Sequence, residues 1–143
     1  MRAIDIVRGL PVVAEPGDTL EHTARLMASN HVDAVVVVEG HRPAGIVTER
    51  DLVVRGLARG LPVDARVDAV MTTDPITLDA GTDAAEAYFT LCRRALHRLP
   101  LVDDGRLVGV LTLDDYLDAP PELVQLVHRV TGEGTPPLLP VIP

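Results

Sequence analysis

Two stretches of this chain share one pattern, and that pattern decides the fold. They read Gly45-Ile46-Val47-Thr48-Glu49-Arg50-Asp51 and Gly109-Val110-Leu111-Thr112-Leu113-Asp114-Asp115, and they lie 64 positions apart. In each stretch an apolar run typical of a buried strand leads into Thr-x-x-Asp, a pattern that is common at the start of a helix. The same strand-to-helix junction found twice in one chain predicts an internal repeat.

The repeat extends outward from both stretches without a gap. The same shift of 64 positions aligns Pro11 with Pro75, Gly17 with Gly81, Val38 with Val102, and Arg42 with Arg106. In each copy a short apolar piece precedes a turn, an amphipathic helix, two strands joined by a tight turn, and a second helix. The sequence therefore predicts a mixed α/β (α+β) fold built from two β-α-β-β-α repeats.

The elements of the two copies are expected at matching places. Strands are predicted at Pro11–Ala14, Ala34–Val38 and Ala44–Val47, and again at Pro75–Leu78, Leu99–Val102 and Leu107–Leu111. The first helix of each copy begins near an acidic capping residue, and its apolar face is predicted to hold Leu20, Ala24, Met27 and Ala28, or Ala84, Tyr88, Leu91 and Cys92. The capping residues are Asp18 and Asp83, and Asp104-Gly105 is the clearer hairpin turn.

We divide the chain into repeat one at residues 1–60, repeat two at 61–120, and a C-terminal segment at 121–143. Pro120-Pro121 can begin a helix, whose apolar face would hold Leu123, Val127 and Val130 and dock on the protein. The prolines that follow predict an extended, Pro-rich tail.

Composition excludes several classes of function. The 143 residues carry a net charge of −8 and only 2% aromatic residues, which argues against binding nucleic acid. The single cysteine fits a reducing compartment, no signal peptide is visible, and no apolar run is long enough to span a membrane. These features predict a cytoplasmic protein without a membrane or nucleic-acid partner.

The two copies, each closing with Gly-apolar-apolar-Thr-x-x-Asp, resemble a pair of CBS domains (a Bateman module). The resemblance covers about residues 1–120, and the stretch 50–57 is similar to stand-alone two-CBS proteins of the hypoxic-response type. It implies two repeats related by a pseudo-twofold axis and a regulatory or sensor module. It also implies an adenosine-containing ligand, such as AMP, ATP or S-adenosylmethionine, in the cleft between the repeats.

The Thr-x-x-Asp motifs permit two interpretations. Thr48 and Thr112 would cap helices, with Asp51 and Asp115 completing a capping box. The resemblance implies that the same residues hold a ribose and a phosphate, since a carboxylate accepts hydrogen bonds from both hydroxyls of a diol. Arg50 adds positive charge beside Asp51.

A second element of the resemblance is Leu96-His97-Arg98-Leu99-Pro100, which is similar to the phosphate-contacting element of nucleotide-binding CBS relatives. Exposed residues at the start of a strand are the alternative interpretation. Repeat one has Asp33 and Ala34 at the equivalent positions, so we expect one preferred site per chain, at Thr48, Asp51, His97 and Arg98. Because aromatics are scarce, an adenine would lie between aliphatic groups of the first strands, which hold Val12 and Val13, or Ile76 and Thr77.

Other chemistry lacks a basis in the sequence. The five histidines show no metal-ligand spacing, Cys92 falls on a core face, and no acid/base pair or activated nucleophile stands out, so an enzyme is not expected. The alternative to a nucleotide sensor is a ligand-free interaction module with the same fold. We also expect a homodimer, formed through apolar positions on the second helices at Leu52, Val53, Leu57, Tyr116 and Leu117, and an unknown regulated partner.

Overall fold

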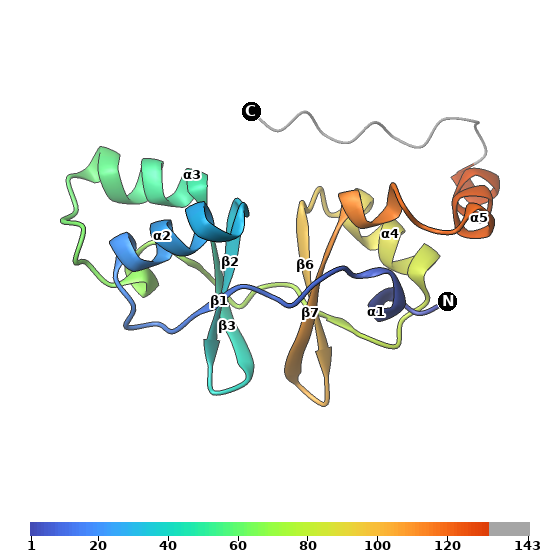
Figure 1. Cartoon of the computed structure of the whole chain (residues 1–143), viewed down its shortest axis with the longest axis horizontal. Helices are drawn as coiled ribbons and strands as arrows, with labels where there is room; N and C mark the ends of the chain where they lie inside the picture. Colours follow the sequence, from blue (N-terminus) through green and yellow to red (C-terminus); the bar gives the residue numbers. More distant parts are fainter. Residues whose placement is uncertain (132–143) are drawn as a thin grey trace. The chain divides into compact units, whose positions relative to one another are not determined.

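The computed structural model describes residues 1–131, which form two compact units. One unit, which we call the Thr48 unit, comprises Leu10–Ile76 and Asp104–Leu107. The other, the Thr112 unit, comprises Met1–Gly9, Thr77–Asp103 and the described chain from Val108. Each unit holds one sheet with helices packed against it (Figure 1), which confirms the predicted mixed α/β fold.

The sheet of the Thr48 unit has four strands in the order β1-β2-β3-β4. They are β1 (Val13–Ala14), β2 (Ala34–Glu39), β3 (Arg42–Thr48) and β4 (Thr72–Thr73). β1 lies parallel to β2, whereas β2 pairs antiparallel with β3, and β3 with β4. Val35, Val36 and Val37 of β2 are at most 2% exposed, as the continuous apolar run predicted.

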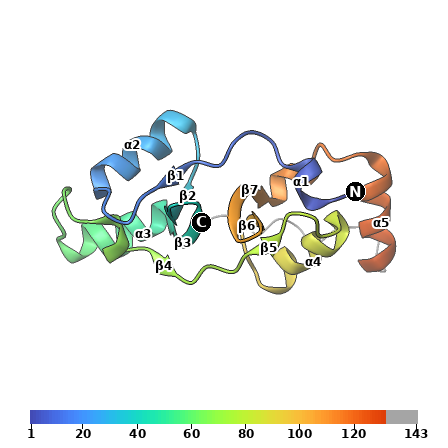
Figure 2. The ribbon, with the colours of Figure 1, turned by 90° about the horizontal axis from the view of Figure 1, so that it is seen from below.

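The helices of this unit follow its strands. They are α2 (Leu20–Asn30), α3 (Glu49–Asp51), the π-helical turn η1 (Leu52–Gly56), and the 3-10 turns η2 (Leu57–Arg59) and η3 (Val67–Ala69). Figures 1 and 2 show α2 and α3 on the same face of the sheet. The predicted second helix is therefore present, but it changes from α to π to 3-10 geometry along its length.

Two expectations for α2 were wrong in detail. Its N-cap is Thr19, whose Oγ1 accepts from the backbone N–H of His22 at 3.0 Å, whereas Asp18 accepts from the N–H of Glu15. Ala24 and Ala28 are exposed, and Thr23 is buried in their place. Thr23 tolerates burial because its hydroxyl donates to the carbonyl of Thr19 at 2.9 Å.

The Thr112 unit repeats the architecture with three strands in the order β5-β6-β7. Its elements are α1 (Ala3–Ile6), β5 (Leu78–Asp79), α4 (Ala84–Arg93), β6 (Arg98–Asp103), β7 (Arg106–Thr112), the 3-10 turn η4 (Leu113–Tyr116) and α5 (Pro121–Thr131). The turn between β6 and β7 and the first two residues of β7 are counted in the Thr48 unit. Asp104 and Gly105 have φ values of 51° and 76°, the left-handed pair that a two-residue hairpin turn requires. The core centres on Leu91, Leu99, Leu101 and Leu111, all fully buried.

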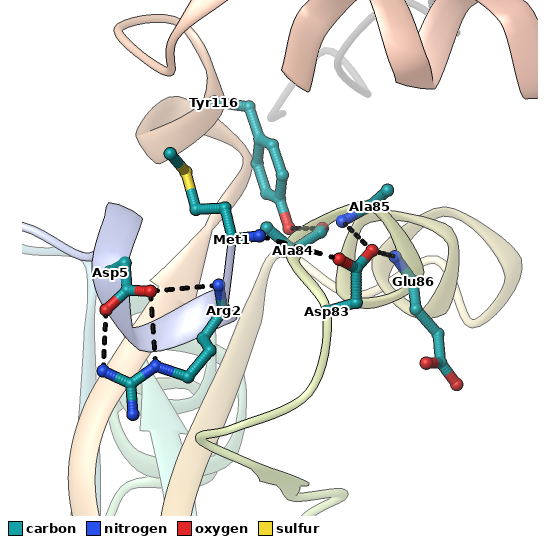
Figure 3. A network of polar contacts seen from close by, with 8 residues as sticks. All are labelled: Met1, Arg2, Asp5, Asp83, Ala84, Ala85, Glu86 and Tyr116. Atoms are coloured by element: carbon teal, nitrogen blue, oxygen red, sulfur yellow. Dashed lines mark hydrogen bonds and ion pairs between the residues drawn. The ribbon is translucent and has the colours of Figure 1, made fainter. Parts of the chain in front are cut away.

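The segment that begins each repeat in the sequence packs in the unit that holds most of the other repeat. Residues 1–9 belong to the Thr112 unit, where the N–H of Ala3 donates to the carbonyl of Thr82 at 2.7 Å. Figure 3 shows this N-terminal segment beside Asp83 and Ala84 at the start of α4. Residues 61–76 belong to the Thr48 unit, where the N–H of Val67 donates to the carbonyl of Asp18 at 2.7 Å.

The C-terminal helix α5 forms where the sequence predicted it. Leu123 and Val127 are 6% and 4% exposed and lie in the core of the Thr112 unit, beside α4. The side chain of Val130 and the predicted Pro-rich tail lie outside the described residues.

Smaller differences concern the first strands and one aromatic residue. The strands predicted at Pro11–Ala14 and Pro75–Leu78 shrink to β1 and β5, and β4 was not predicted. Tyr116, expected on an exposed helix face, is 9% exposed because its hydroxyl donates to the carbonyl of Ala84 at 2.7 Å (Figure 3).

Candidate functional site

Thr48 and Asp51 form a reciprocal pair at the junction of β3 and α3. The N–H of Thr48 donates to Oδ2 of Asp51 at 2.9 Å, and the N–H of Asp51 donates to Oγ1 of Thr48 at 3.1 Å. The hydroxyl of Thr48 also donates to the same Oδ2 at 3.0 Å. The capping box predicted from the spacing is therefore formed, and it fixes the orientation of the carboxylate.

The other oxygen of this carboxylate, Oδ1, has a different environment. Its ion-pair partner is Nε of Arg55, one helical turn further on, at 3.7 Å. The side chain of Asp51 is 15% exposed and that of Arg55 is 44% exposed, so solvent reaches the pair. Oδ1 can thus accept a hydrogen bond from a bound hydroxyl while Oδ2 keeps the cap intact.

The backbone at this junction is largely satisfied within the protein. The N–H of Glu49 donates to the carbonyl of Asp33 at 2.9 Å, and that of Asp51 is taken by Thr48. A phosphate near this junction would therefore depend on cationic side chains more than on backbone N–H groups. Arg50, the predicted cation beside Asp51, has an exposed side chain.

The second motif forms the same cap in a buried setting. The N–H of Thr112 donates to Oδ2 of Asp115 at 2.8 Å, yet Asp115 is only 8% exposed. Burial raises the pKa of Asp115, and hydrogen bonds from Thr112 and from the backbone of Arg8 partly oppose that shift. The guanidinium of Arg8 also forms an ion pair with Asp118. The N-terminal segment therefore covers this carboxylate, whereas Asp51 stays accessible.

The remaining predicted residues lie at strand ends. Val13 is in β1, paired with Val36, and is 40% exposed. His97 is exposed, and Arg98 begins β6 with a half-buried side chain whose Nη1 donates to the carbonyl of His97 at 2.8 Å. Each unit thus brings its own Thr and Asp together, and the Thr112 unit also holds His97 and Arg98 side by side.

Arg55 is the residue that the sequence analysis missed. Its position four residues after Asp51 is the spacing of an intrahelical ion pair, and that spacing was the available signal. The second copy has Ala119 at the equivalent position, so the pairing belongs to the first motif alone.

Among the side chains that the structure describes, which exclude that of His128, no group of three or more His, Cys, Asp or Glu is arranged to hold a metal ion. Within residues 1–131, every helix is too short or too polar to cross a membrane.

Comparison with known proteins gives matches over most of the chain. A family model described as the CBS domain matches residues 3–57 and again 67–122. The protein MK0525 of Methanopyrus kandleri is 32% identical over 128 residues, an alignment that covers 87% of this chain and 65%, just under two thirds, of that relative.

Two solved structures extend the comparison to the fold. The CBS domain protein PAE2072 from Pyrobaculum aerophilum, complexed with AMP, superposes with a TM-score of 0.79 at 25% identity and covers 90% of this chain and 99% of its own. Hypoxic Response Protein I, solved with two coordinated zinc ions, gives a TM-score of 0.75 at 27% identity and covers 85% of this chain and 100% of its own.

Proposed function

Because this chain belongs to the CBS domain family and carries two copies of the domain, we propose that it is a regulatory module that binds an adenosine-containing nucleotide. The ligand class comprises AMP, ATP and S-adenosylmethionine. The site we assign is the first motif, Thr48 and Asp51, and the second motif serves the structure of its own unit.

This proposal rests on the surroundings of the two oxygens of the Asp51 carboxylate. Its Oδ2 is held by Thr48, so the side chain is already oriented before any ligand arrives. Its Oδ1 lies 3.7 Å from Nε of Arg55, and the side chain of Asp51 is 15% exposed. A ribose diol that donates to Oδ1 would therefore bind a preorganised acceptor, which lowers the entropy cost of binding.

We assign the binding of the ligand's phosphate to cationic side chains. Arg50 is exposed next to Asp51, and arginine matches the geometry of phosphate oxygens. His97 and Arg98 remain predicted contributors through the family resemblance, and Val13 a predicted neighbour of the base. The AMP complex of the relative PAE2072 supports an adenosine nucleotide as the ligand class.

A ligand-free interaction module is the second candidate, and one observation favours it. Both Thr-x-x-Asp motifs satisfy their own backbone groups, so neither cap needs a ligand to be stable. In either case we propose a regulatory and not a catalytic role, with an unidentified regulated protein as partner. We also propose that two copies of the chain associate.

A thermal-shift titration with AMP, ATP and S-adenosylmethionine tests the proposal. A ligand that binds only the folded state raises stability by RT ln(1 + [L]/Kd), so at 100 times Kd the gain is about 2.7 kcal/mol. We expect at least one of the three to raise the melting temperature of the wild type and to have a smaller effect on Asp51→Ala. If none of them shifts the wild type at millimolar concentration, the interaction module becomes the better proposal.

A further inference from the structure

Arg55 joins the candidate ribose-binding carboxylate to a distant segment of the same unit. Its Nε lies 3.7 Å from Oδ1 of Asp51, while its Nη1 donates to the carbonyls of Val70 and Met71 at 3.4 and 3.5 Å. These three contacts are long, so the guanidinium is shared between the carboxylate and the carbonyls, and neither holds it firmly.

The backbone that carries Arg55 is unusual. Residues 52–56 form a π-helical turn, in which the N–H of Leu57 donates to the carbonyls of both Leu52 and Val53. Such turns are rare and occur often at functional sites. The equivalent positions of the second copy, residues 116–120, begin at the last residue of the 3-10 turn η4 and continue into a turn and a bend, and Ala119 replaces the arginine. Among the described residues, an arginine that contacts both the aspartate of the motif and a distant pair of carbonyls is therefore present beside the first motif alone.

The segment that Arg55 reaches is also tied to the sheet. Thr72 and Thr73 form β4 and pair with Ile46 and Gly45 of β3, the strand that ends at Thr48. Gly45 is required there, because a Cβ at this position would lie 2.8 Å from the carbonyl oxygen of Thr72. Val70 and Val67 are fully buried in the core of the unit. Residues 70–73 are therefore joined both to the core of the unit and, through Thr72 and Thr73, to β3.

We propose that Arg55 is a positioning residue that couples occupancy of the Asp51 corner to the segment of residues 70–73. This inference rests on the proposed function, since it assumes that a ribose hydroxyl donates to Oδ1 of Asp51. That hydroxyl and Nε of Arg55 compete for the same oxygen. When the ribose hydroxyl displaces Nε of Arg55 from Oδ1, the guanidinium moves fully to the carbonyls of Val70 and Met71. Residues 70–73 are then more tightly held.

Hydrogen exchange at the amides of residues 70–73 tests the coupling in the full-length protein, with and without AMP. The variants are Arg55→Ala, Arg55→Lys and Arg59→Ala, and their melting temperatures check that each is folded. Arg59 is an exposed arginine of η2, so its replacement by alanine removes the same charge without touching the contacts of Arg55. Lysine keeps the charge but offers a single nitrogen, which cannot contact the carboxylate and both carbonyls together.

Without AMP, Arg55→Ala should speed exchange at these amides by about two- to fivefold, the range for losing one exposed charge contact, while Arg59→Ala should leave it unchanged. With AMP, exchange should slow in the wild type and in Arg59→Ala but not in Arg55→Ala, and Arg55→Lys should recover only part of the effect. Equal AMP-free exchange in Arg55→Ala and Arg59→Ala would overturn the role of Arg55. An AMP response that persists in Arg55→Ala would overturn the coupling.

The failure of the proposed function would look different from the failure of this inference. If none of AMP, ATP and S-adenosylmethionine produces a heat of binding or a change of exchange in the wild type, the nucleotide assignment fails. The AMP-free comparison of Arg55→Ala with Arg59→Ala still decides whether Arg55 holds residues 70–73.

Discussion

The two carboxylate oxygens of Asp51 have different partners. Oδ2 completes the cap of α3, and Oδ1 faces Arg55. Asp115 uses its Oδ2 in the same way, but its side chain is buried and the N-terminal segment lies against it. The two motifs have the same sequence pattern and the same cap. They differ in burial, and our proposal of the first motif as the ligand site rests on that difference.

The first prediction concerns nucleotide binding at the residue scale. Asp51→Ala and Arg98→Ala should each weaken AMP binding by about 1–3 kcal/mol, the cost of losing a hydrogen bond to a charged group. Asp115→Ala should weaken it much less, because its carboxylate is only 8% exposed. Isothermal titration calorimetry of the three variants measures this directly. Two equal sites per chain, or binding that is lost only in Asp115→Ala, would contradict the assignment.

The second prediction follows from the raised pKa of Asp115. A carboxyl group whose pKa is higher in the folded than in the unfolded protein binds more protons when folded, so its ionisation costs stability as the pH rises. The wild type should therefore lose unfolding free energy relative to Asp115→Asn as the pH rises from about 4 toward 7. The guanidinium groups of Arg2 and Arg66 lower the pKa values of Asp5 and Asp68, but both proteins share these shifts.

Urea denaturation at several pH values measures this difference. Asp114→Asn is the matched control, since it removes one charge from an exposed neighbouring side chain. The curve for Asp114→Asn is the reference with which the curve for Asp115→Asn is compared between about pH 4 and 7. The same pH dependence in both variants would mean that burial does not penalise the ionised carboxylate of Asp115.

At this scale the sequence predicts pairs of nearby residues well and distant contacts poorly. The three-residue spacing of Thr48 and Asp51 defines a capping box, so their partnership follows from the spacing alone. The i, i+4 spacing of Asp51 and Arg55 is also common on solvated helix faces, and it gave no reason to single out Arg55. Asp115 also accepts a hydrogen bond from the backbone of Arg8, a residue that no local pattern connects to it.

At the scale of elements, α5 shows how an amphipathic pattern becomes a docked helix. Leu123 and Val127 enter the core of the Thr112 unit, while Leu126 on the same helix is 39% exposed. We predict that Leu123→Ala lowers the free energy of unfolding by about 2–5 kcal/mol, the range for truncating a buried leucine.

Leu126→Ala, which makes the same chemical change at a more exposed position of α5, should cost less than about 1 kcal/mol. Thermal or urea unfolding of both variants gives the comparison. Equal losses would show that α5 does not dock through the predicted face.

Long, periodic elements were predictable, and the short ones were not. The continuous valine run of β2 and the amphipathic period of α4 each extend over enough residues to give a clear signal. β4 has two residues, and it exists because Thr72 and Thr73 find a partner strand in β3. The π-helical turn η1 has no sequence signature, and it appears only from the hydrogen bonds that the chain forms.

At the scale of the whole molecule, each unit depends on both halves of the sequence. The Thr48 unit takes Val67 and Val70 into its core from the linker that follows repeat one, and the Thr112 unit takes Ala3 and Ile6 from the start of repeat one. The predicted boundaries at residues 1–60 and 61–120 describe the repeats in the sequence. A fragment cut at residue 60 would leave each unit without part of its core.

The proposed association of two copies rests on apolar side chains that the described chain leaves in solvent. Of the five positions predicted for this surface, Tyr116 is buried and Leu52 packs against the core of the Thr48 unit. Val53, Leu57 and Leu117 are 54%, 75% and 70% exposed, so these three remain available for a contact. These three side chains are therefore the candidates for the contact between copies.

We predict that light scattering at micromolar concentration gives twice the chain mass of 15.3 kDa for the wild type. Leu57→Glu should shift the mass toward one chain, because a dimer contact would have to desolvate the new carboxylate. Leu10→Glu is the matched control, since Leu10 is 92% exposed and lies outside the helices proposed for the contact. A mass near 15.3 kDa for the wild type, or equal effects of the two substitutions, would contradict a contact through Leu57.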